Sequence, residues 1–279
     1  MKQKRVAAIH DISCLGRCSL TVALPIISAA GVETAVIPTA VLSTHTGGFE
    51  NYTFKDLSDN IVPVARHWKS EGITADAVYT GYLCSREQIY LALEASRLIS
   101  NDKTLLITDP VMADNGKLYK GFARDYPNYM LKLCSAADII TPNITEASLM
   151  LGTEFKNGPY TEEYINGLLC GLYLKTGAEI VLTGVYFDDR KIGAAVYDGN
   201  GTSYVFSERM DKMYHGTGDV FTSTLTAALM NGRSLKASAQ IAANFTCACI
   251  KKTMENGTEA RLGVNFESQL PSLIKYLEL

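Results

Sequence analysis

The residues with the clearest chemical potential form the stretch His215-Gly216-Thr217-Gly218-Asp219, which comes just before an apolar helical pattern. Glycines allow a tight turn that exposes consecutive backbone N–H groups, and the positive end of the following helix dipole points at that turn. Such a helix start suits an anion such as a transferring phosphoryl group. Asp219 adds a carboxylate that could accept a proton from a hydroxyl attacking the phosphate. The plainer interpretation is a glycine turn followed by an acid in the first helical turn, where carboxylates are favoured anyway.

Two more acids follow the strand pattern of residues 104–108. Asp109 comes directly after this pattern, and Asp114 lies a few residues further on in an expected loop. Carboxylates in such a place could hold Mg²⁺ through water, as phosphate-transfer sites need. A simple turn would account for the same residues, because Asp and Pro are common turn formers.

Asn143 and Glu146 open a helical pattern that follows another strand pattern, residues 138–141. Residues three apart on a helix can share one side, so an amide and a carboxylate would lie together there. The alternative is a capping arrangement in which Asn143 is the N-cap and Glu146 reaches back to it. The two interpretations are compatible if Glu146 also orders metal-bound water.

Two ring-bearing residues occupy other loops and strand ends. His45 lies among hydroxyl residues and glycines, and we assign it to substrate or fold contact and not to base chemistry. Tyr82 follows Gly81 after the strand pattern of residues 77–80, where it could stack on a flat ring. An aromatic residue at a strand end can equally serve in packing.

Alternating strand and helix patterns must position these residues. The expected strands are short apolar runs, and the expected helices carry spaced apolar residues. The strands are 6–9, 34–38, 40–42, 77–80, 104–108, 138–141 and 179–183; the helices are 19–30, 55–70, 85–100, 126–133, 143–151 and 161–176. Residues 191–197 and 202–207 alternate around a glycine turn and predict a hairpin, after which the chain is nearly all helix.

This alternation predicts an α/β fold with a largely parallel sheet covered on both faces. No linker or composition break divides the chain, so residues 1–279 are expected to form one domain. In such sheets ligands bind at the carboxyl ends of the strands. The polar clusters follow those ends, which predicts one shared active site.

Composition excludes several classes of protein. The chain has 279 residues, 47% hydrophobic, and a formal net charge of −3, which argues against nucleic acid as the main partner. Its seven cysteines are irregularly spaced without a Cys-x-x-Cys pair, which fits free thiols in a reducing cytoplasm. No stretch has the length of a signal peptide's apolar region or of a membrane span. Neither a P-loop nor a dinucleotide-binding glycine motif is present.

Taken together, the motifs resemble those of pyridoxal kinases in the ribokinase superfamily. The matching runs keep their order and span nearly the whole chain: Thr44-His45-Thr46-Gly47, Thr80-Gly81-Tyr82, Asp109-Pro110-Val111 with Asp114, Thr141-Pro142-Asn143 with Glu146, and Gly216-Thr217-Gly218-Asp219. The resemblance implies a three-layer α/β/α sandwich with a β-hairpin region followed by helices near its C-terminus. It also implies ATP-dependent phosphorylation of the 5′-hydroxymethyl group of pyridoxal, pyridoxamine or pyridoxine. Mg²⁺, often a monovalent cation such as K⁺, and usually a homodimer belong to the same expectation.

The resemblance also implies a role for each matching residue. Asp219 would be the base, and the amides of Gly216, Thr217 and Gly218 would form the anion hole. The substrate ring would be surrounded by Asp11 or Ser13, by Thr46 and by Tyr82. On the nucleotide side, Asn143 and Glu146 would order Mg²⁺ and phosphates, with Asp109 and Asp114 near the metal; Tyr119 would cover the phosphates, and Thr183 would contact ATP.

Two positions depart from the usual pattern of the family. The N-terminal loop around Ser13 is shorter, and Gly184 stands after Thr183 where a second hydroxyl residue is common. Two rival functions also remain open. One is a hydroxymethylpyrimidine kinase of the same superfamily, and the other is a catalytically silent ligand-binding or regulatory protein on this fold.

Overall fold

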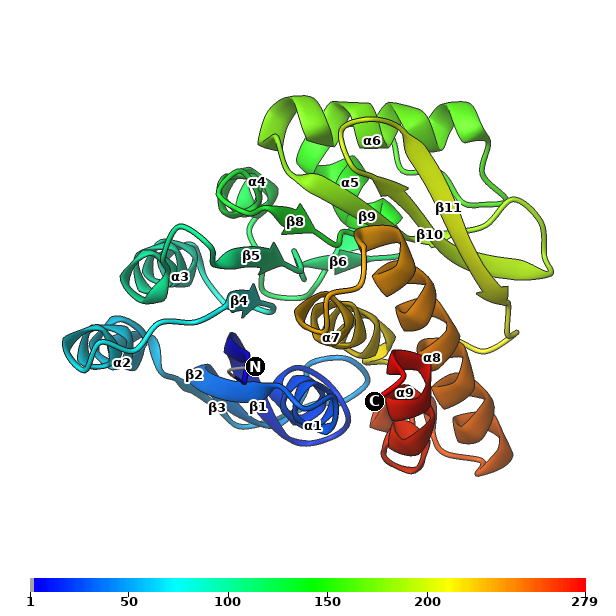
Figure 1. Ribbon diagram of the computed structural model, residues 1–279. Coiled ribbons are helices and arrows are strands. Elements are labelled where there is room, and N and C mark those ends of the chain that lie inside the picture. The colour runs from blue at the N-terminus through cyan, green and yellow to red at the C-terminus, as the bar shows by residue number, and fades with distance from the viewer. Residues whose placement is uncertain (1–2) are drawn as a thin grey trace.

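The computed structural model describes residues 3–279, which fold around one large twisted sheet (Figure 1). In sheet order the strands are β11 (Thr202–Glu208), β10 (Lys191–Tyr197), β9 (Glu179–Val185), β8 (Ile139–Ile140), β5 (Leu105–Thr108), β4 (Ala77–Thr80), β1 (Arg5–Leu15), β2 (Glu33–Thr44) and β3 (Phe54–Asp56). The strands from β9 to β2 pair in parallel. The outer strands β3, β10 and β11 are antiparallel to their neighbours.

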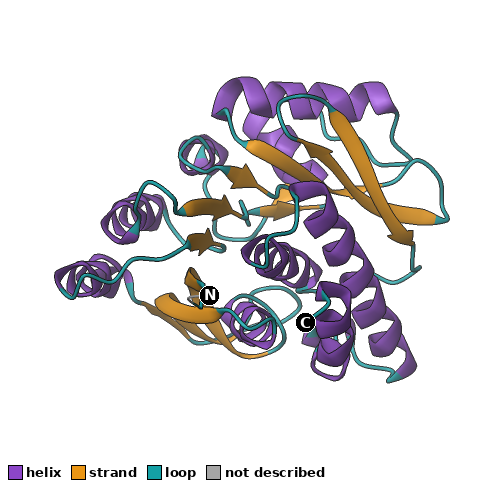
Figure 2. Ribbon diagram, viewed as in Figure 1, coloured by secondary structure: helices purple, strands orange, loops and turns teal. Residues whose placement is uncertain are grey.

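Helices cover both faces of this sheet, and each face has its own apolar core (Figure 2). On one face lie α2 (Ser58–Ser70), α3 (Arg86–Ile99), α4 (Tyr126–Cys134), α5 (Ile144–Leu151) and α6 (Glu162–Thr176). On the other face lie α1 (Leu20–Ala29), α7 (Thr217–Met230), α8 (Leu235–Glu255) and α9 (Leu270–Leu277). This arrangement confirms the predicted α/β class and its three layers.

The order of the strands reverses at β1, which lies between β2 and β4. In an open parallel sheet the connections on either side of such a reversal lead to opposite faces, and this leaves a crevice at the carboxyl ends of the strands. The polar residues singled out in the sequence follow those ends. The topology therefore brings together segments that are far apart along the chain.

Helix α7 passes close to this crevice and is unusually deeply buried. All nine residues from Val220 to Ala228 are buried, and the helix packs between α1 and α8. Two of its threonines find partners within the helix: Thr224 and Thr226 donate to carbonyls one turn earlier. Burial on all sides fixes the helix axis, so the residues at its first turn have a defined position.

Several predicted boundaries differ from the structure. The first strand is longer than the expected 6–9, since it runs on through Asp11 to Leu15. The two expected strands 34–38 and 40–42 are one strand, β2. The helix expected at 55–70 begins only at Ser58, because Phe54–Asp56 pairs with β2 as the edge strand β3. A small hairpin of β6 (Ala113–Asp114) and β7 (Lys117–Leu118) was not predicted.

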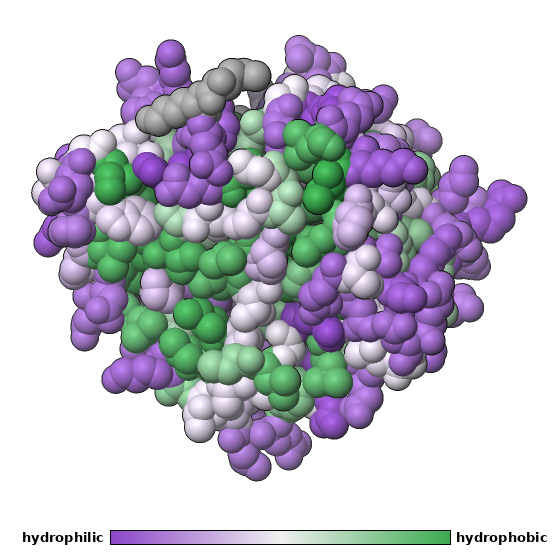
Figure 3. Space-filling model, turned by 60° about the horizontal axis from the view of Figure 1, so that its bottom comes forward, coloured by the Kyte–Doolittle hydropathy of each residue, from purple (hydrophilic) through white to green (hydrophobic). Residues whose placement is uncertain are grey.

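The lower face of the molecule carries apolar residues on its surface. Figure 3 turns the bottom of Figure 1 toward the viewer, where α1, β2 and β3 lie, and hydrophobic residues gather across the middle of that face. The exposed large apolar side chains of the protein include Leu15 at the end of β1, Leu24 on α1 and Phe54 on β3. Across residues 3–279, none of the helices has both the length and the apolar character needed to cross a lipid bilayer.

Candidate active site

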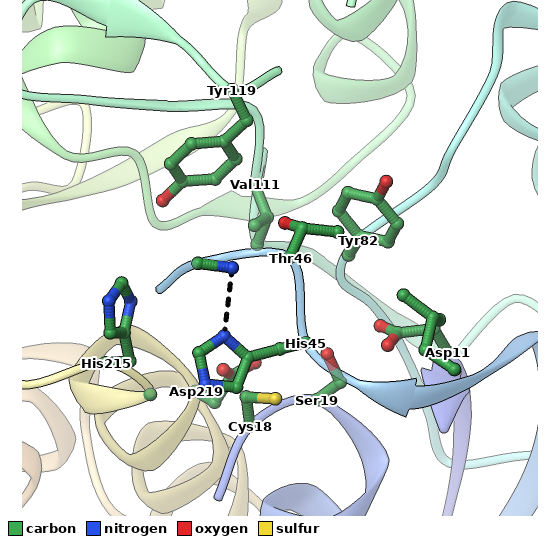
Figure 4. A pocket seen from close by; sticks show the side chains of 13 residues that line it. Asp11, Cys18, Ser19, His45, Thr46, Tyr82, Val111, Tyr119, His215 and Asp219 are labelled. Atoms are coloured by element: carbon green, nitrogen blue, oxygen red, sulfur yellow. Dashed lines mark hydrogen bonds between the residues drawn. The ribbon is translucent and has the colours of Figure 1, made fainter. Parts of the chain in front are cut away.

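A pocket lies where the ends of β1, β2 and β4 meet the N-terminus of α7 (Figure 4). Its walls combine acids, aromatic rings, a thiol, hydroxyls and glycines from six segments of the chain. The lining residues are Asp11, Cys18, Ser19, Leu42, His45, Thr46, Gly47, Tyr82, Val111, Tyr119, His215, Gly216 and Asp219. The pocket thus occupies the crevice that the strand order predicts.

The start of α7 has the geometry expected of an anion site. Gly216 is its N-cap and adopts φ 77°, and a Cβ there would lie only 1.9 Å from the carbonyl oxygen of Arg17, so the position requires glycine. Within residues 3–279, the backbone N–H groups of Gly216, Thr217 and Gly218 have no hydrogen-bond acceptor. The Thr217 hydroxyl donates to the carbonyl oxygen of Tyr214 at 3.3 Å and so holds the turn. Three free amides at a helix start can receive a phosphoryl group.

Asp219 lies beside these amides in the first turn of α7. Burial raises the pKa of its carboxyl group to about 7; the backbone amide of Ser19 acts in the opposite direction, and the charge of Asp11 raises the pKa further. A carboxyl group that titrates near neutrality can take up a proton at physiological pH. The position and the raised pKa both suit a general base.

Asp11 lines the same pocket, and in Figure 4 it lies on the opposite side of Ser19 from Asp219. It lies at a register shift of β1 between His10 and Ile12, and such a bulge re-aims a side chain. Burial raises its pKa to about 6 against the effect of the Ser19 and Ser13 hydroxyls. Ser13 itself does not line the pocket and donates to Asp11 Oδ2 at 3.3 Å.

Thr46 and Tyr82 face the pocket from two further segments. Tyr82 follows β4, and its ring packs against Phe122 with 5.7 Å between the ring centroids. Burial raises the pKa of the Tyr82 hydroxyl, so the ring carries no charge at neutral pH. The pocket therefore has an aromatic wall that a flat ring could contact.

Asp109 lies buried behind the start of α7. Its Oδ2 atom accepts a hydrogen bond of 3.2 Å from the Thr222 hydroxyl, one turn along the helix from Asp219. Burial and the nearby charge of Asp219 raise the pKa of Asp109 well above its usual range. The two acids predicted from separate motifs are therefore close enough to interact.

Glu146 and Asn143 form the capping box at the start of α5, as the alternative interpretation predicted. Glu146 accepts hydrogen bonds from the amides of Asn143 and Met112 at 2.9 and 3.1 Å. The Asn143 side chain accepts from the Glu146 amide and donates to the carbonyl oxygen of Ala113, both at 2.9 Å. These contacts connect α5 to the β6–β7 hairpin, and neither residue lines the pocket.

Asp114 and Tyr119 belong to the segment around the β6–β7 hairpin. Asp114 is half-buried, and burial raises its pKa. Tyr119 lines the pocket and has four acids around it, since burial and the charges of Glu146, Asp114, Asp109 and Asp219 all raise its pKa. Thr183 lies in β9 outside the pocket and donates to the carbonyl oxygen of Pro142 at 3.3 Å.

His45 is held by hydrogen bonds at both ring nitrogens. Nδ1 accepts from the Gly47 amide at 3.1 Å, shown dashed in Figure 4, so the proton must be on Nε2, which donates to the carbonyl oxygen of Arg261 at 2.6 Å. Burial lowers its pKa and favours this neutral form. His45 therefore holds the loop after β2 against the C-terminal region and also lines the pocket.

The structure thus gathers Asp11, Thr46, Tyr82, Tyr119, Gly216 and Asp219 in one pocket. The other predicted residues lie outside its lining: Ser13, Asp109, Asp114, Asn143, Glu146, Thr183, Thr217 and Gly218. Sequence reasoning missed Cys18 and Ser19, which follow the glycine turn after β1 and precede α1. Their place between a strand end and a helix start was the one indication that could have identified them.

Comparison with known proteins places the chain in a family. A family model described as phosphomethylpyrimidine kinase matches residues 23–263. A crystal structure from Bacteroides thetaiotaomicron, provisionally described as a phosphomethylpyrimidine kinase and solved with pyridoxal, is 36% identical with a TM-score of 0.91, covering 98% of this chain and 96% of that one. Pyridoxal kinase from Lactobacillus plantarum is 30% identical with a TM-score of 0.89, covering 100% and 99% of the two chains.

A curated relative carries the pyrimidine activity in its name. The hydroxymethylpyrimidine/phosphomethylpyrimidine kinase of Bacillus subtilis is 29% identical over 231 residues, which are 81% of this chain and 79% of the relative. The chain belongs to the phosphomethylpyrimidine kinase family, in the group of ribokinase-like folds that includes the pyridoxal kinases.

Proposed function

We propose that this protein transfers the γ-phosphoryl group of ATP to the 5′-hydroxymethyl group of pyridoxal, pyridoxamine or pyridoxine. The observation that carries the proposal is the pairing of Asp219 with three free amides at the start of α7. A base and an anion site side by side serve a hydroxyl that attacks a phosphoryl group. The solved relative that contains pyridoxal supports the choice of a pyridine substrate.

In this proposal each wall of the pocket has a function. The substrate hydroxyl lies at Asp219, which takes up its proton as the oxygen attacks the phosphorus. The amides of Gly216, Thr217 and Gly218 donate to the transferring group and stabilise its charge. The ring lies toward Asp11, Thr46 and Tyr82, which are among the polar and aromatic lining residues. Tyr119 closes the nucleotide side, where Asn143 and Thr183 would contact ATP.

The acids of the site fit a water-mediated magnesium ion. Among residues 3–279, no three His, Cys, Asp or Glu side chains are arranged to hold a metal directly. Asp109, Asp114 and Glu146 nevertheless lie around Tyr119 together with Asp219. Mg²⁺ usually keeps several waters and binds through one or two carboxylates plus phosphates. Bound there, Mg²⁺ would neutralise phosphate charge, with Asp109 and Asp114 as its ligands through water and Glu146 fixed behind them.

The proposal is tested by side-by-side turnover. Purified protein would be incubated with Mg-ATP and each of pyridoxal, pyridoxamine, pyridoxine and hydroxymethylpyrimidine, and ADP formation and the phosphorylated product would be measured. The expected result is the highest kcat/KM for a B6 vitamer. Faster turnover of the pyrimidine would favour the second candidate, which the Bacillus subtilis relative supports. No ATP consumption with any of the four would favour a silent binding protein.

Three further features belong to the proposal. We propose a cytoplasmic enzyme, in keeping with seven cysteines that are all free thiols. We also propose activation by a monovalent cation such as K⁺ and assembly as a homodimer, both on the basis of the resemblance described above. Replacing K⁺ by a larger organic cation in the assay would test the first of these two, and sedimentation would test the second.

A further inference from the structure

Ser19 has a backbone conformation that its position in the fold does not explain. It is the N-cap of α1, with φ 52° and ψ −131°. This region resembles the first central position of a type II′ turn, which glycine dominates. A serine held there costs free energy, and such strain persists where the surrounding structure imposes it, often at functional sites.

The hydroxyl of Ser19 is also not used as an N-cap hydroxyl normally is. Serine and threonine at this position usually accept a hydrogen bond from an amide of the first helical turn. Ser85, Thr161 and Ser234 do so at the starts of α3, α6 and α8. Ser19 makes no such bond, although its carbonyl oxygen accepts from Val22 and Ala23. The side chain lines the pocket instead.

Within the pocket Ser19 lies between the two acids. Figure 4 shows it with Asp219 on one side and Asp11 on the other. Its backbone amide lowers the pKa of Asp219, and its hydroxyl lowers the pKa of Asp11. Among the described residues Oδ1 of Asp11 has no hydrogen-bond partner and Ser19 makes no hydrogen bond to either acid, so its contacts with both are loose. Loose contacts of this kind commonly tighten when substrate binds.

We propose that Ser19 is a positioning residue that links the ring-binding carboxyl of Asp11 to the base Asp219, with its amide directed at the base and its hydroxyl at Asp11. The strained backbone is what allows both groups to face the pocket at once. In an unstrained N-cap the hydroxyl would turn to the helix. The inference rests on the proposed function, because it takes Asp219 as the base and Asp11 as a contact of the substrate ring.

Two variants separate the contributions of Ser19. Ser19→Gly keeps the amide, removes the hydroxyl and relieves the backbone strain. We expect it to raise the unfolding midpoint while kcat/KM falls about tenfold, since the substrate-bound site loses a hydrogen-bond donor to a charged group. Glu278→Gly is the matched control, because Glu278 has φ 58° far from the pocket in sequence and fold. It should leave kcat/KM unchanged.

Ser19→Ala removes the hydroxyl and keeps both the amide and the strain. Carboxyl carbons would be titrated by NMR in the unmodified protein and in the variant. The pKa of Asp11 should rise above about 6, because the charged form loses a donor. The pKa of Asp219 should stay near 7 or fall slightly, because Asp11 becomes less charged. The other titratable groups near the pair are Asp109, Cys18, Tyr79, Tyr82, Cys84, Tyr119 and His215.

An unchanged pKa of Asp11 in Ser19→Ala, or full activity of Ser19→Gly, would overturn the inference. The titration needs no substrate, so its outcome does not depend on which compound is phosphorylated. Failure of the proposed function has a different signature, namely no turnover of any B6 vitamer by the unmodified protein. The two failures can therefore be told apart.

Discussion

Asp219 combines two properties that are rarely found together, since it is an acid in a buried environment and it lies next to an anion site. Burial raises its pKa to about 7, mainly by disfavouring the charged form. A base must be deprotonated to accept a proton, so kcat/KM for the vitamer should decrease about tenfold for each pH unit below about 7. A pH–rate profile from pH 5 to 9 measures this decrease in kcat/KM. A profile that stays flat down to pH 5 would contradict the role of Asp219 as the base.

Replacing this acid tests its chemical and its energetic role together. Asp219→Asn should lower kcat by a factor of roughly 10² to 10⁴, the usual contribution of general base catalysis, while ATP still binds. The folded-state pKa lies above the ordinary value of 3.8, so the ionised group destabilises the fold as pH rises from about 4 through 7. The variant should therefore be more stable than the unmodified protein at pH 8, and the difference should disappear near pH 4.

The control for this variant is an acid of the same type outside the site. Asp102 is exposed, in the loop before β5. Asp102→Asn should change neither kcat nor the pH dependence of the unfolding midpoint measured by calorimetry. If Asp219→Asn retained more than a tenth of the normal turnover, the proton would have to go elsewhere.

At the scale of the element, the start of α7 can be tested with glycines alone. A Cβ added at Gly218 would meet only Asp109 Oδ2, at 4.0 Å, so Gly218→Ala should fold normally. Its methyl group would take space at the anion site, and kcat should fall by about 10²-fold or more. Gly216→Ala should instead be unstable, because its Cβ would collide with the carbonyl oxygen of Arg17. Thermal unfolding and turnover of both variants provide the comparison.

Gly167 in the middle of α6 is the matched control, since no atom lies within 4 Å of a Cβ built there. Gly167→Ala should stabilise the protein by about 0.5 to 1 kcal/mol through helix propensity and leave kcat unchanged. If Gly218→Ala were also fully active, the amides of this turn could not form the anion hole.

The helices and strands also show which sequence patterns are sufficient to predict an element and which are not. The helix after Asn143 and its capping box were predictable, because both hydrogen bonds join residues three apart. The edge strand β3 was not predictable, since its three residues are all exposed and the strand with which it pairs, β2, is separated from it by the loop of residues 45–53. Ser19 looks like an ordinary N-cap in the sequence, and only the folded chain shows its hydroxyl turned to the pocket.

At the scale of the whole molecule, the site depends on the order of the strands. Asp11 and Tyr82 come from the first third of the chain and Asp219 from the last, and no local pattern specifies that they meet. The sequence indicated that polar residues follow strand ends, which was sufficient to predict one site. Which of them line the pocket depends on the reversal at β1 and on the burial of α7 between two other helices.

The lower face of the molecule is the surface through which we expect two copies of the protein to assemble. Leu15 at the end of β1, Leu24 on α1 and Phe54 on β3 are 55%, 40% and 44% exposed, and Figure 3 shows hydrophobic residues gathered across the middle of the face where α1 and β3 lie. Exposed apolar patches of this kind mark contact surfaces, and the same patch on two copies forms a closed dimer. We expect a homodimer in sedimentation velocity, and we expect Leu24→Glu or Phe54→Glu to convert it to a monomer. Leu174→Glu is the matched control, because Leu174 is 85% exposed on α6, on the opposite side of Figure 1. A monomeric unmodified protein, or equal dissociation by the control, would show that this face is not the interface.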